Sequence, residues 1–336
     1  MKKLRQIISI LLKLGVAVAV LGYLLNKMGL DQLGHTLQAT AREWPWLMAG
    51  LTLCLIALLI GMARWKTILD AQGMKLNWLR VNTIFFIGLF FNAFMIGPTG
   101  GDFIKAYYTA QETHHKKTEA VTTIFIDRVV GLLVLALLTG TVILTRWDFF
   151  MTHSITRVFA WPALIACGIL LAGSLVAFSV HLFEVFPWLK RWNHIAMIGK
   201  IVNTLERAYN AFYVCRKNPR LLISLALYSL IIQLLFVGTT ALVGKALGLD
   251  LPFLAYLSFS PLVGLISAIP ITPGGIGIRE GASIKLWSVL GVPDEKAFLL
   301  AFIPFLLLVL WGLPGGILFL FHRAGNKPAE SGEDEP

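Results

Sequence analysis

An apolar run in this chain is interrupted by the sequence Pro98-Thr99-Gly100-Gly101-Asp102-Phe103-Ile104-Lys105. A second apolar run is interrupted by Pro270-Ile271-Thr272-Pro273-Gly274-Gly275-Ile276-Gly277-Ile278-Arg279. Each stretch carries a cation four residues after its Gly-Gly pair, Lys105 in the first and Arg279 in the second. Broken, glycine-rich segments in two halves of a membrane protein are typical of a transport site at the interface between two repeats.

The composition is that of a membrane protein. Of the 336 residues, 57% are hydrophobic and 14% are charged, whereas soluble domains carry about a quarter of charged residues. The formal net charge of +11 could suit nucleic acid, but the cations lie in short loops beside apolar runs. That distribution is the orientation signal of a polytopic membrane protein, and nucleic-acid binding needs a basic soluble face. We therefore expect no nucleic-acid partner.

Motifs for metal or enzymatic chemistry were sought as well. The cysteines Cys54, Cys167 and Cys215 are scattered and match no disulfide framework or metal-ligand spacing. The pair His114-His115 lies in a basic loop, and we expect no metal there. The sequence contains no His-Glu-x-x-His, Gly-x-Ser-x-Gly or P-loop motif. We predict no metal and no cofactor, and we do not expect the chain to act as an enzyme.

Six apolar runs have the length that a membrane-spanning helix needs, roughly 20 residues. The first follows a basic start, and we interpret it as a retained span or signal anchor because no small-residue cleavage site closes it. Two further runs, Val81–Ile96 and Leu254–Ile269, are too interrupted to be ordinary spans. The six predicted spans are Ile7–Leu25, Trp44–Met62, Thr122–Leu144, Val158–Val180, Leu221–Val243 and Ala297–Phe321.

The basic residues between the runs predict the orientation of the chain. Arg64, Lys66, Lys75 and Arg80 flank one connection, and the loops of the opposite side hold few cations. The positive-inside rule places the basic side and both termini in the cytoplasm. The six spans then alternate correctly only if the two broken runs enter the membrane and return to the same side. The alternative, a full span over Phe103–Lys117, would place several charged residues in hydrocarbon at a severe cost.

Landmarks of the first half recur in the second half at a near-constant offset, which predicts an internal repeat. Each half then contains a span, a re-entrant hairpin and a span. The odd span between the halves makes the second half inverted, a recurrent transporter architecture. The offsets are 177 residues from Trp44 to Leu221, 173 from Val81 to Leu254, 174 from Gly100 to Gly274 and 175 from Thr122 to Ala297.

We predict a single integral membrane domain over residues 1–327, all-α, with six full spans and two re-entrant hairpins. The first repeat covers about 44–145, the second about 221–321, and a linking span lies at 158–180. Residues 196–212 place apolar side chains on one helical face, which predicts an amphipathic helix on the membrane surface or against the bundle. The acidic tail at 328–336 is predicted to be disordered.

The glycine-rich turns are candidate anion sites. Glycine permits backbone conformations that other residues resist and proline breaks helices, so half-helices should begin after both turns. Freed amides and the positive helix end suit a phosphate, and Lys105 and Arg279 would add formal charge. The alternative is a tight helix crossing that needs small residues. A transport site predicts that the turns approach each other near the midplane, with both cations facing one cavity.

Charged side chains beside the turns complete the candidate site. Asp102 can cap the helix that follows it or pair with Lys105. Asp127 and Arg128 lie near the inner end of a span, where a buried ion pair or a snorkelling arginine is at least as good an explanation as a functional role. The candidate substrate-binding residues are Pro98, Gly100, Gly101, Asp102, Lys105, Asp127, Arg128, Pro273, Gly274, Gly275, Gly277, Arg279 and Glu280.

Three motifs resemble a known family. They are Gly97-Pro98-Thr99-Gly100-Gly101-Asp102-Phe103-Ile104-Lys105-Ala106-Tyr107, Ile126-Asp127-Arg128-Val129-Val130-Gly131 and Thr272-Pro273-Gly274-Gly275-Ile276-Gly277-Ile278-Arg279-Glu280-Gly281. They look like the membrane region of lysylphosphatidylglycerol synthase, also called the flippase-like or UPF0104 family, and the resemblance spans most of the chain. It implies movement of lipids or lipid-linked molecules between leaflets. Asp127 stands where the family usually carries a glutamate.

The resemblance also bears on enzymatic activity. The full synthase carries a soluble aminoacyl-transfer domain after its membrane region, whereas this chain ends in a short acidic tail. We therefore do not expect aminoacyl transfer.

We hypothesise that the protein is a flippase-like lipid translocase of the bacterial inner membrane, with anionic membrane lipids as its partners. The two turns would receive an anionic phospholipid or lipid-linked headgroup while the acyl chains stay in the bilayer. Two alternatives are open. One is a secondary transporter of a small anion, in which Asp102, Glu280 or His114 would titrate. The other is an accessory subunit that positions a phospholipid-synthesis enzyme.

Overall fold

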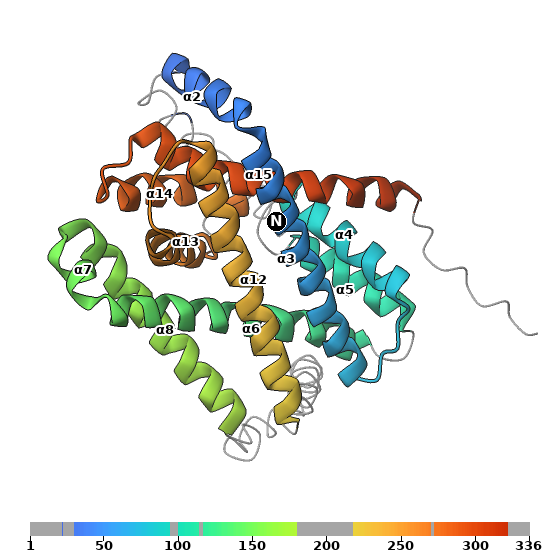
Figure 1. Ribbon diagram of the computed structural model, residues 1–336. Helices are drawn as coiled ribbons and strands as arrows, with labels where there is room; N and C mark the ends of the chain where they lie inside the picture. The colour runs from blue at the N-terminus through green and yellow to red at the C-terminus, as the bar shows by residue number, and fades with distance from the viewer. Residues whose placement is uncertain are drawn as a thin grey trace, which may run out of the picture.

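The computed structural model describes Gly22 and residues 30–94, 100–113, 117–179, 218–269 and 272–321. These parts of the chain form eleven α-helices and one short 3-10 helix, η2 (Figure 1). The first predicted span (apart from Gly22), the surface helix at 196–212 and the tail at 328–336 lie outside the described residues. The elements are α2 (Leu30–Arg42), α3 (Trp44–Ala71), α4 (Trp78–Phe94), α5 (Gly100–Glu112), α6 (Lys117–Thr145), α7 (Trp147–Thr152), α8 (Ser154–Ser179), α12 (Pro219–Ala246), α13 (Phe253–Ser267), η2 (Pro273–Gly275), α14 (Ile278–Ser288) and α15 (Asp294–Phe321).

Five helices are long and apolar enough to cross a membrane, namely α3, α6, α8, α12 and α15. They coincide with the five spans predicted within the described residues, so the sequence placed these spans correctly. The shorter apolar helices α4 and α13 lie where the two broken runs were predicted. Each is followed by a less apolar helix, α5 or α14.

Helices α3 and α12 form an antiparallel pair along much of their length, blue and gold in Figure 1. Near one end, a Cβ on Gly50 would lie 3.8 Å from the Thr239 carbonyl oxygen. Near the other end, the Arg64 guanidinium reaches Ser229. The residue numbers rise along α3 in the direction in which they fall along α12, so the two helices are antiparallel. Because α3 belongs to the first half of the chain and α12 to the second, the two halves meet at this pair.

The first broken segment folds back on itself as a helical hairpin. At its open end, Arg80 of α4 forms an ion pair with Glu112 of α5, with 3.3 Å between Nη1 and Oε1. Near the turn, the Gly101 amide donates to Asn92 Oδ1 at 3.0 Å. A Cβ on Gly101 would come 1.8 Å from the Gly88 carbonyl oxygen. Gly101 therefore permits a close helix contact, which is the alternative explanation that the sequence left open for this turn.

The second broken segment forms a matching hairpin from α13 and α14. The rings of Tyr256 and Trp287 lie 5.2 Å apart near its open end. Near the turn, a Cβ on Gly275 would lie 3.1 Å from Ser267. Gly274, Gly275 and Gly277 have φ angles of +61°, +72° and +87°, a region that side chains with a Cβ rarely adopt. These glycines turn the chain within ten residues, between the end of α13 and the start of α14.

The two hairpins approach the α3–α12 pair from opposite ends. Lys66 of α3 lies 5.7 Å from the ring centroid of Trp78, which places the open end of the first hairpin beside the C-terminal end of α3. Tyr256 packs so closely on Gly244 that a Cβ there would lie 2.0 Å from its hydroxyl oxygen. The open end of the second hairpin therefore lies beside the C-terminal end of α12. Because α3 and α12 are antiparallel, the open ends of the two hairpins lie at opposite ends of this helix pair.

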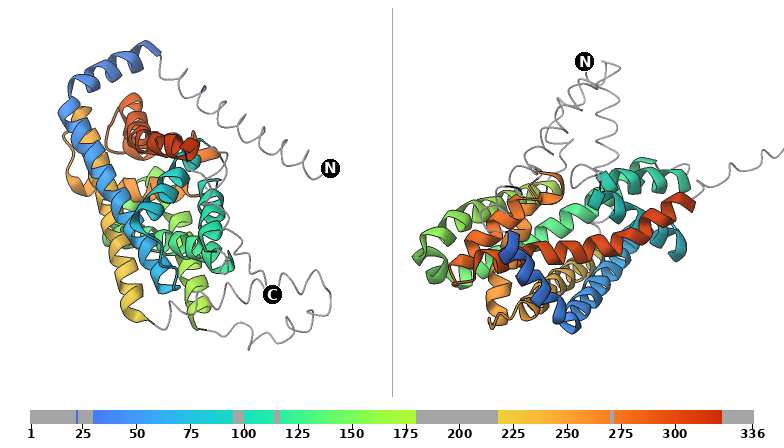
Figure 2. Two further views of the ribbon diagram at one scale, coloured as in Figure 1. Left: turned by 90° about the vertical axis from the view of Figure 1, so that its right-hand side faces the viewer. Right: turned by 90° about the horizontal axis from the view of Figure 1, so that it is seen from above.

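Each hairpin packs on the last long helix of the other half. Helix α4 crosses α15 so closely that a Cβ on Gly315 would lie 1.9 Å from the Phe86 carbonyl oxygen. In the other half, α13 packs against α6, where Gly264 faces Leu135. The contact of α5 with α6 likewise corresponds to that of α14 with α15. Figure 2 shows α15 in red running beside the teal helices of the first hairpin.

An aromatic core holds the second hairpin in place. Phe150 of α7 is fully buried and its ring packs edge-on against Phe259 of α13 at 6.4 Å. Phe259 in turn packs edge-on against Trp287 of α14 at 5.1 Å. Arg146 donates from Nη1 to Ser258 Oγ at 2.8 Å and ties the end of α6 to the same hairpin. These contacts fix the second hairpin to α7 and to the end of α6.

Candidate functional site

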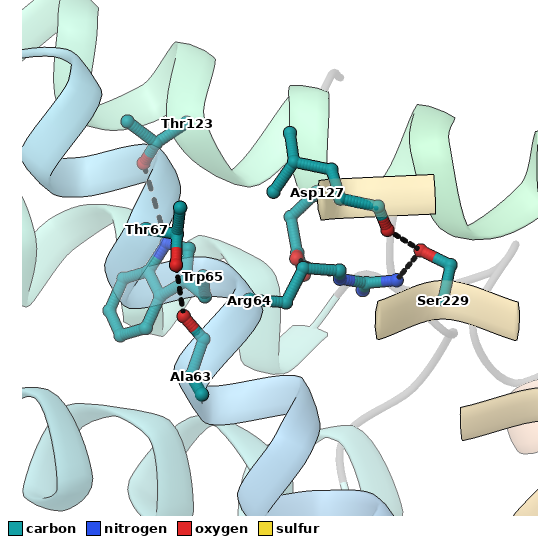
Figure 3. Close-up of polar contacts among 8 residues, drawn as sticks. Ala63, Arg64, Trp65, Thr67, Thr123, Asp127 and Ser229 are labelled. Atoms are coloured by element: carbon teal, nitrogen blue, oxygen red, sulfur yellow. Dashed lines mark hydrogen bonds and ion pairs between the residues drawn. The ribbon is translucent and has the colours of Figure 1, made fainter. Parts of the chain in front are cut away.

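A buried ion pair joins the two halves of the chain. Arg64 of α3 donates from Nε to Asp127 Oδ1 of α6 at 2.8 Å and from Nη1 to Ser229 Oγ of α12 at 2.7 Å (Figure 3). Both charged side chains are only 12% exposed. The Ser229 hydroxyl donates to the Leu225 carbonyl oxygen, which orients its lone pairs toward the arginine. Asp127 is thus held by an ion pair, as one of the two explanations from sequence proposed.

The sequence did not identify Arg64 as part of this network, because it counted the residue as a loop cation that sets orientation. In the structure Arg64 lies inside α3, seven residues before its end. Its guanidinium rests on Gly131 of α6, where a Cβ would lie 3.2 Å from Nη1. Gly131 therefore opens the space that the guanidinium needs. Its partners Asp127 and Ser229 lie 63 and 165 residues away in the chain, which no local pattern could reveal.

Asp127 and its neighbour Arg128 form ion pairs with different helices, Asp127 with α3 and Arg128 with α5. Arg128 donates from Nε to Asp102 Oδ2 of α5 at 2.5 Å and ties the first hairpin to α6. The Arg128 side chain is 45% exposed and that of Asp102 is 15% exposed. The sequence allowed Asp102 to pair with Lys105, whereas the ion pair in the structure is with Arg128.

Lys105 is the cation of this cluster without a close carboxylate. It is 5% exposed, and its ammonium lies 4.2 Å from the ring centroid of Trp65 and 5.0 Å from that of Phe85. Among the described residues, no carboxylate oxygen lies within 4 Å of its Nζ. Within the described residues, Arg64, Lys105 and Arg128 are thus accompanied by two carboxylates, Asp102 and Asp127, so the cluster has one basic side chain more than it has carboxylates.

The second turn is arranged differently. Glu280 is fully buried, and its Oε2 accepts from the Gly277 amide at 2.6 Å. Its Oε1 accepts from Arg279 Nε at 3.0 Å, and the guanidinium carbon lies 4.2 Å from the ring centroid of Phe305. A carboxylate of the chain itself therefore occupies the helix start that the sequence offered to an external anion.

At the first turn, too, an amide that was expected to be free for an external anion binds a side chain of the protein, since the Gly101 amide donates to Asn92. Asn92 and the capping role of Glu280 were both missed from sequence. A polar residue three positions after a helix start was the available signal for Glu280. Pro98 lies outside the described residues, Gly100 begins α5, and Pro273 begins η2.

The structure does not bring Lys105 and Arg279 to one cavity. Arg279 lines a cavity of about 270 Å³ whose described walls come only from α12, α13, α14 and α15. Lys105 points instead toward α3 and α4. In Figure 1, α5 and α14 lie on either side of α3 and α12. The physical reason is that the hairpins enter from opposite ends and each half-helix packs within its own half, α5 on α4 and α6, α14 on α13 and α15.

Within the described residues no group of three or more His, Cys, Asp or Glu side chains could hold a metal ion. The arrangement that the structure offers is therefore ionic and hydrogen-bonding. Its charged side chains pair with one another between apolar helices.

Five candidate spans, two helical hairpins and a buried ionic cluster define an integral membrane protein with several spans. The chain belongs to the lysylphosphatidylglycerol synthase TM region family, whose model matches residues 10–315. It is similar to UPF0104 membrane proteins of three archaea. The relative from Pyrococcus horikoshii is 26% identical over 294 residues, 82% of this chain and 87% of the relative.

The other two relatives are more distant in identity. The relative from Methanothermobacter thermautotrophicus is 21% identical, covering 86% of this chain and 85% of its own. The relative from Methanocaldococcus jannaschii is 23% identical, covering 83% of both chains. No solved structure was found to match the chain.

Proposed function

We propose that this protein is a lipid translocase that binds an anionic phospholipid or lipid-linked headgroup at the Lys105 cluster and moves it between leaflets. The observation that carries the proposal is the buried ammonium of Lys105, which lies over two aromatic rings and, within the described residues, has no carboxylate oxygen within 4 Å. A buried charge without a partner is costly, and intramembrane charges mark substrate pathways more often than not. A phosphate at Lys105 would compensate the excess positive charge of the cluster.

The proposal includes the membrane arrangement that the sequence predicted. The two hairpins would be re-entrant and would belong to an inverted repeat, with both termini in the cytoplasm of a bacterial inner membrane. The antiparallel α3–α12 pair, the opposite approach of the hairpins and the matched helix contacts support an inverted repeat. Lys105 and Arg279 are also separated by 174 residues, the same offset as their glycine pairs.

The position of the cluster favours recruitment from the basic side. Lys66 and Arg80 lie at the open end of the first hairpin, the side that the positive-inside rule assigns to the cytoplasm. Each basic residue near an anionic leaflet attracts it by about 1 kcal/mol. An anionic lipid gathered there would reach Lys105 by way of the first hairpin.

The test is headgroup transfer in liposomes. Purified protein is reconstituted with labelled phosphatidylglycerol confined to one leaflet, and the rate at which label reaches the other leaflet is measured. We expect the protein to accelerate transfer and Lys105→Met to slow it about tenfold or more, since bonds to charged groups contribute about 1.5–3 kcal/mol. Lys285→Met is the matched control, because Lys285 is exposed on α14. An equal rate for both variants, or no acceleration by the unmodified protein, would contradict the proposal.

The same preparation separates the alternatives. Transfer or uptake that follows an imposed proton gradient would indicate a secondary transporter of an anion. Absence of transfer by the isolated protein, together with co-purification of a phospholipid-synthesis enzyme, would indicate an accessory subunit. Labelled phosphatidylcholine, which has no net charge, tests whether the anionic headgroup is required.

A further inference from the structure

We infer that the second half of the chain holds a separate ligand site that takes a neutral, hydroxyl-bearing group such as a sugar or glycerol headgroup. The site is the cavity of about 270 Å³ between α12, α13, α14 and α15 together with an adjoining cavity of about 170 Å³. The two share Phe236, Thr240, Ser260 and Gly264 as lining residues, so they form one cleft. This inference goes beyond the proposed function and does not depend on it.

The lining of the cleft has the composition of a small-molecule site, with many apolar walls and a few convergent polar groups. The polar groups include the Ser260 hydroxyl, the Thr240 hydroxyl, the Gln233 amide and the Arg279 guanidinium, whereas the Ser283 hydroxyl already donates to the Ala297 carbonyl oxygen. The Ser260 oxygen is buried and has no hydrogen-bond partner among the described residues. A buried hydroxyl without a partner is costly, and a ligand that donates or accepts there would satisfy it.

The charge balance of the cleft favours a ligand without net charge. Arg279 is the charged residue among those that line the cleft within the described parts of the chain. Glu280 already neutralises it through bonds to Nε and Nη2. An anion would have to compete with a fully buried carboxylate, and a cation would face the guanidinium. Hydroxyl groups can bond to Ser260, Thr240 and Gln233 without disturbing that ion pair.

Aromatic walls favour the apolar faces of a sugar or glycerol group. Phe236, Trp287 and Phe305 all line the larger cavity, and Phe305 also stacks under the Arg279 guanidinium. Apolar C–H faces gain from burial against such rings. The chemistry required of the ligand is therefore a set of hydroxyls on an apolar face, which a glycolipid headgroup and a free sugar both present.

The experiment measures binding of monogalactosyl diacylglycerol to the purified full chain in detergent. We expect it to bind at least tenfold more tightly than phosphatidylcholine, which is also neutral but has no hydroxyl. Ser260→Ala and Gln233→Leu should each weaken binding about three- to tenfold, the range for one hydrogen bond. Ser224→Ala is the control, because Ser224 is exposed and bonds only to the Arg220 carbonyl oxygen.

Three outcomes decide the inference. Equal binding of the two lipids, or unchanged galactolipid binding in both Ser260→Ala and Gln233→Leu, would overturn it. Competition by free galactose at similar concentration would support the hydroxyl chemistry and assign the ligand to the soluble sugars. Binding of phosphatidylglycerol to the Lys105→Met variant separates the two sites, because that variant should lose the anionic lipid and keep the galactolipid. Circular dichroism of each variant verifies that it is folded.

Discussion

The first and second hairpins carry their cations at equivalent positions but compensate them in opposite ways. In the second hairpin, Arg279 is bound by the adjacent Glu280, which also caps α14. In the first hairpin, the Lys105 ammonium lies over the rings of Trp65 and Phe85, and the nearby carboxylates of the described residues form their ion pairs with arginines. The cation of the second hairpin thus has a carboxylate partner, whereas the cation of the first hairpin has none within 4 Å among the described residues. A shared sequence pattern therefore does not imply a shared role.

The largest expected effect is in the compensated hairpin. Glu280→Ala would leave the Arg279 guanidinium without its partner and the Gly277 amide without an acceptor. Removing one member of a buried ion pair destabilises a protein by about 3–5 kcal/mol. Thermal unfolding in detergent should show a strongly lowered midpoint. The double variant Arg279→Met, Glu280→Ala is the control and should recover part of the loss. A midpoint for Glu280→Ala equal to that of the unmodified protein would show that the pair is not needed.

A smaller effect is expected at the turn of the first hairpin. Gly101→Ala would drive a Cβ into the Gly88 carbonyl oxygen at 1.8 Å, and forced contacts of this kind cost about 1–3 kcal/mol. Gly281→Ala in α14 meets nothing within 4 Å and should raise stability by about 0.5–1 kcal/mol through helix propensity. Unfolding midpoints that move in opposite directions would support the close α4–α5 contact. A midpoint for Gly101→Ala that stays level or rises would contradict it.

The smallest effect on stability is expected at the uncompensated cation. Lys105→Met removes a buried ammonium that lacks a carboxylate and keeps an apolar side chain of similar length on Trp65. Replacing such a charge by a hydrophobic residue is often neutral or stabilising, so we expect the unfolding midpoint to stay level or to rise. A loss as large as that of Glu280→Ala would mean that Lys105 is compensated after all, and the contrast between the hairpins would disappear.

The sequence was sufficient for the features that depend on local pattern. The length and hydrophobicity of apolar runs located five spans, because a helix in lipid must satisfy its backbone internally and present apolar side chains. Glycine and proline located both breaks, since few other residues tolerate the dihedral angles at Gly274 and Gly277. The constant offset between landmarks anticipated hairpins that approach from opposite ends.

The sequence was insufficient where partners come from distant helices. Arg64 belongs to the charge cluster because α3, α6 and α12 meet at Gly131 and Ser229, a contact that no local spacing encodes. The separation of Lys105 from the cavity of Arg279 likewise depends on how each half-helix packs. The Gly101 amide is bound by Asn92 of the preceding helix, which the folded hairpin brings into place, whereas the Gly277 amide is bound by Glu280 three residues further on.

The contact of Gly315 with the Phe86 carbonyl oxygen has a mechanical consequence. The two backbones are in direct contact there, with no side chain between them. A displacement of α4 along α15 would therefore displace α15 as well. Helix α13 also packs on α6, through the Leu135 side chain at Gly264, so each hairpin contacts a long helix of the other half. The two halves are therefore joined through both of these helix contacts and do not form two separate domains.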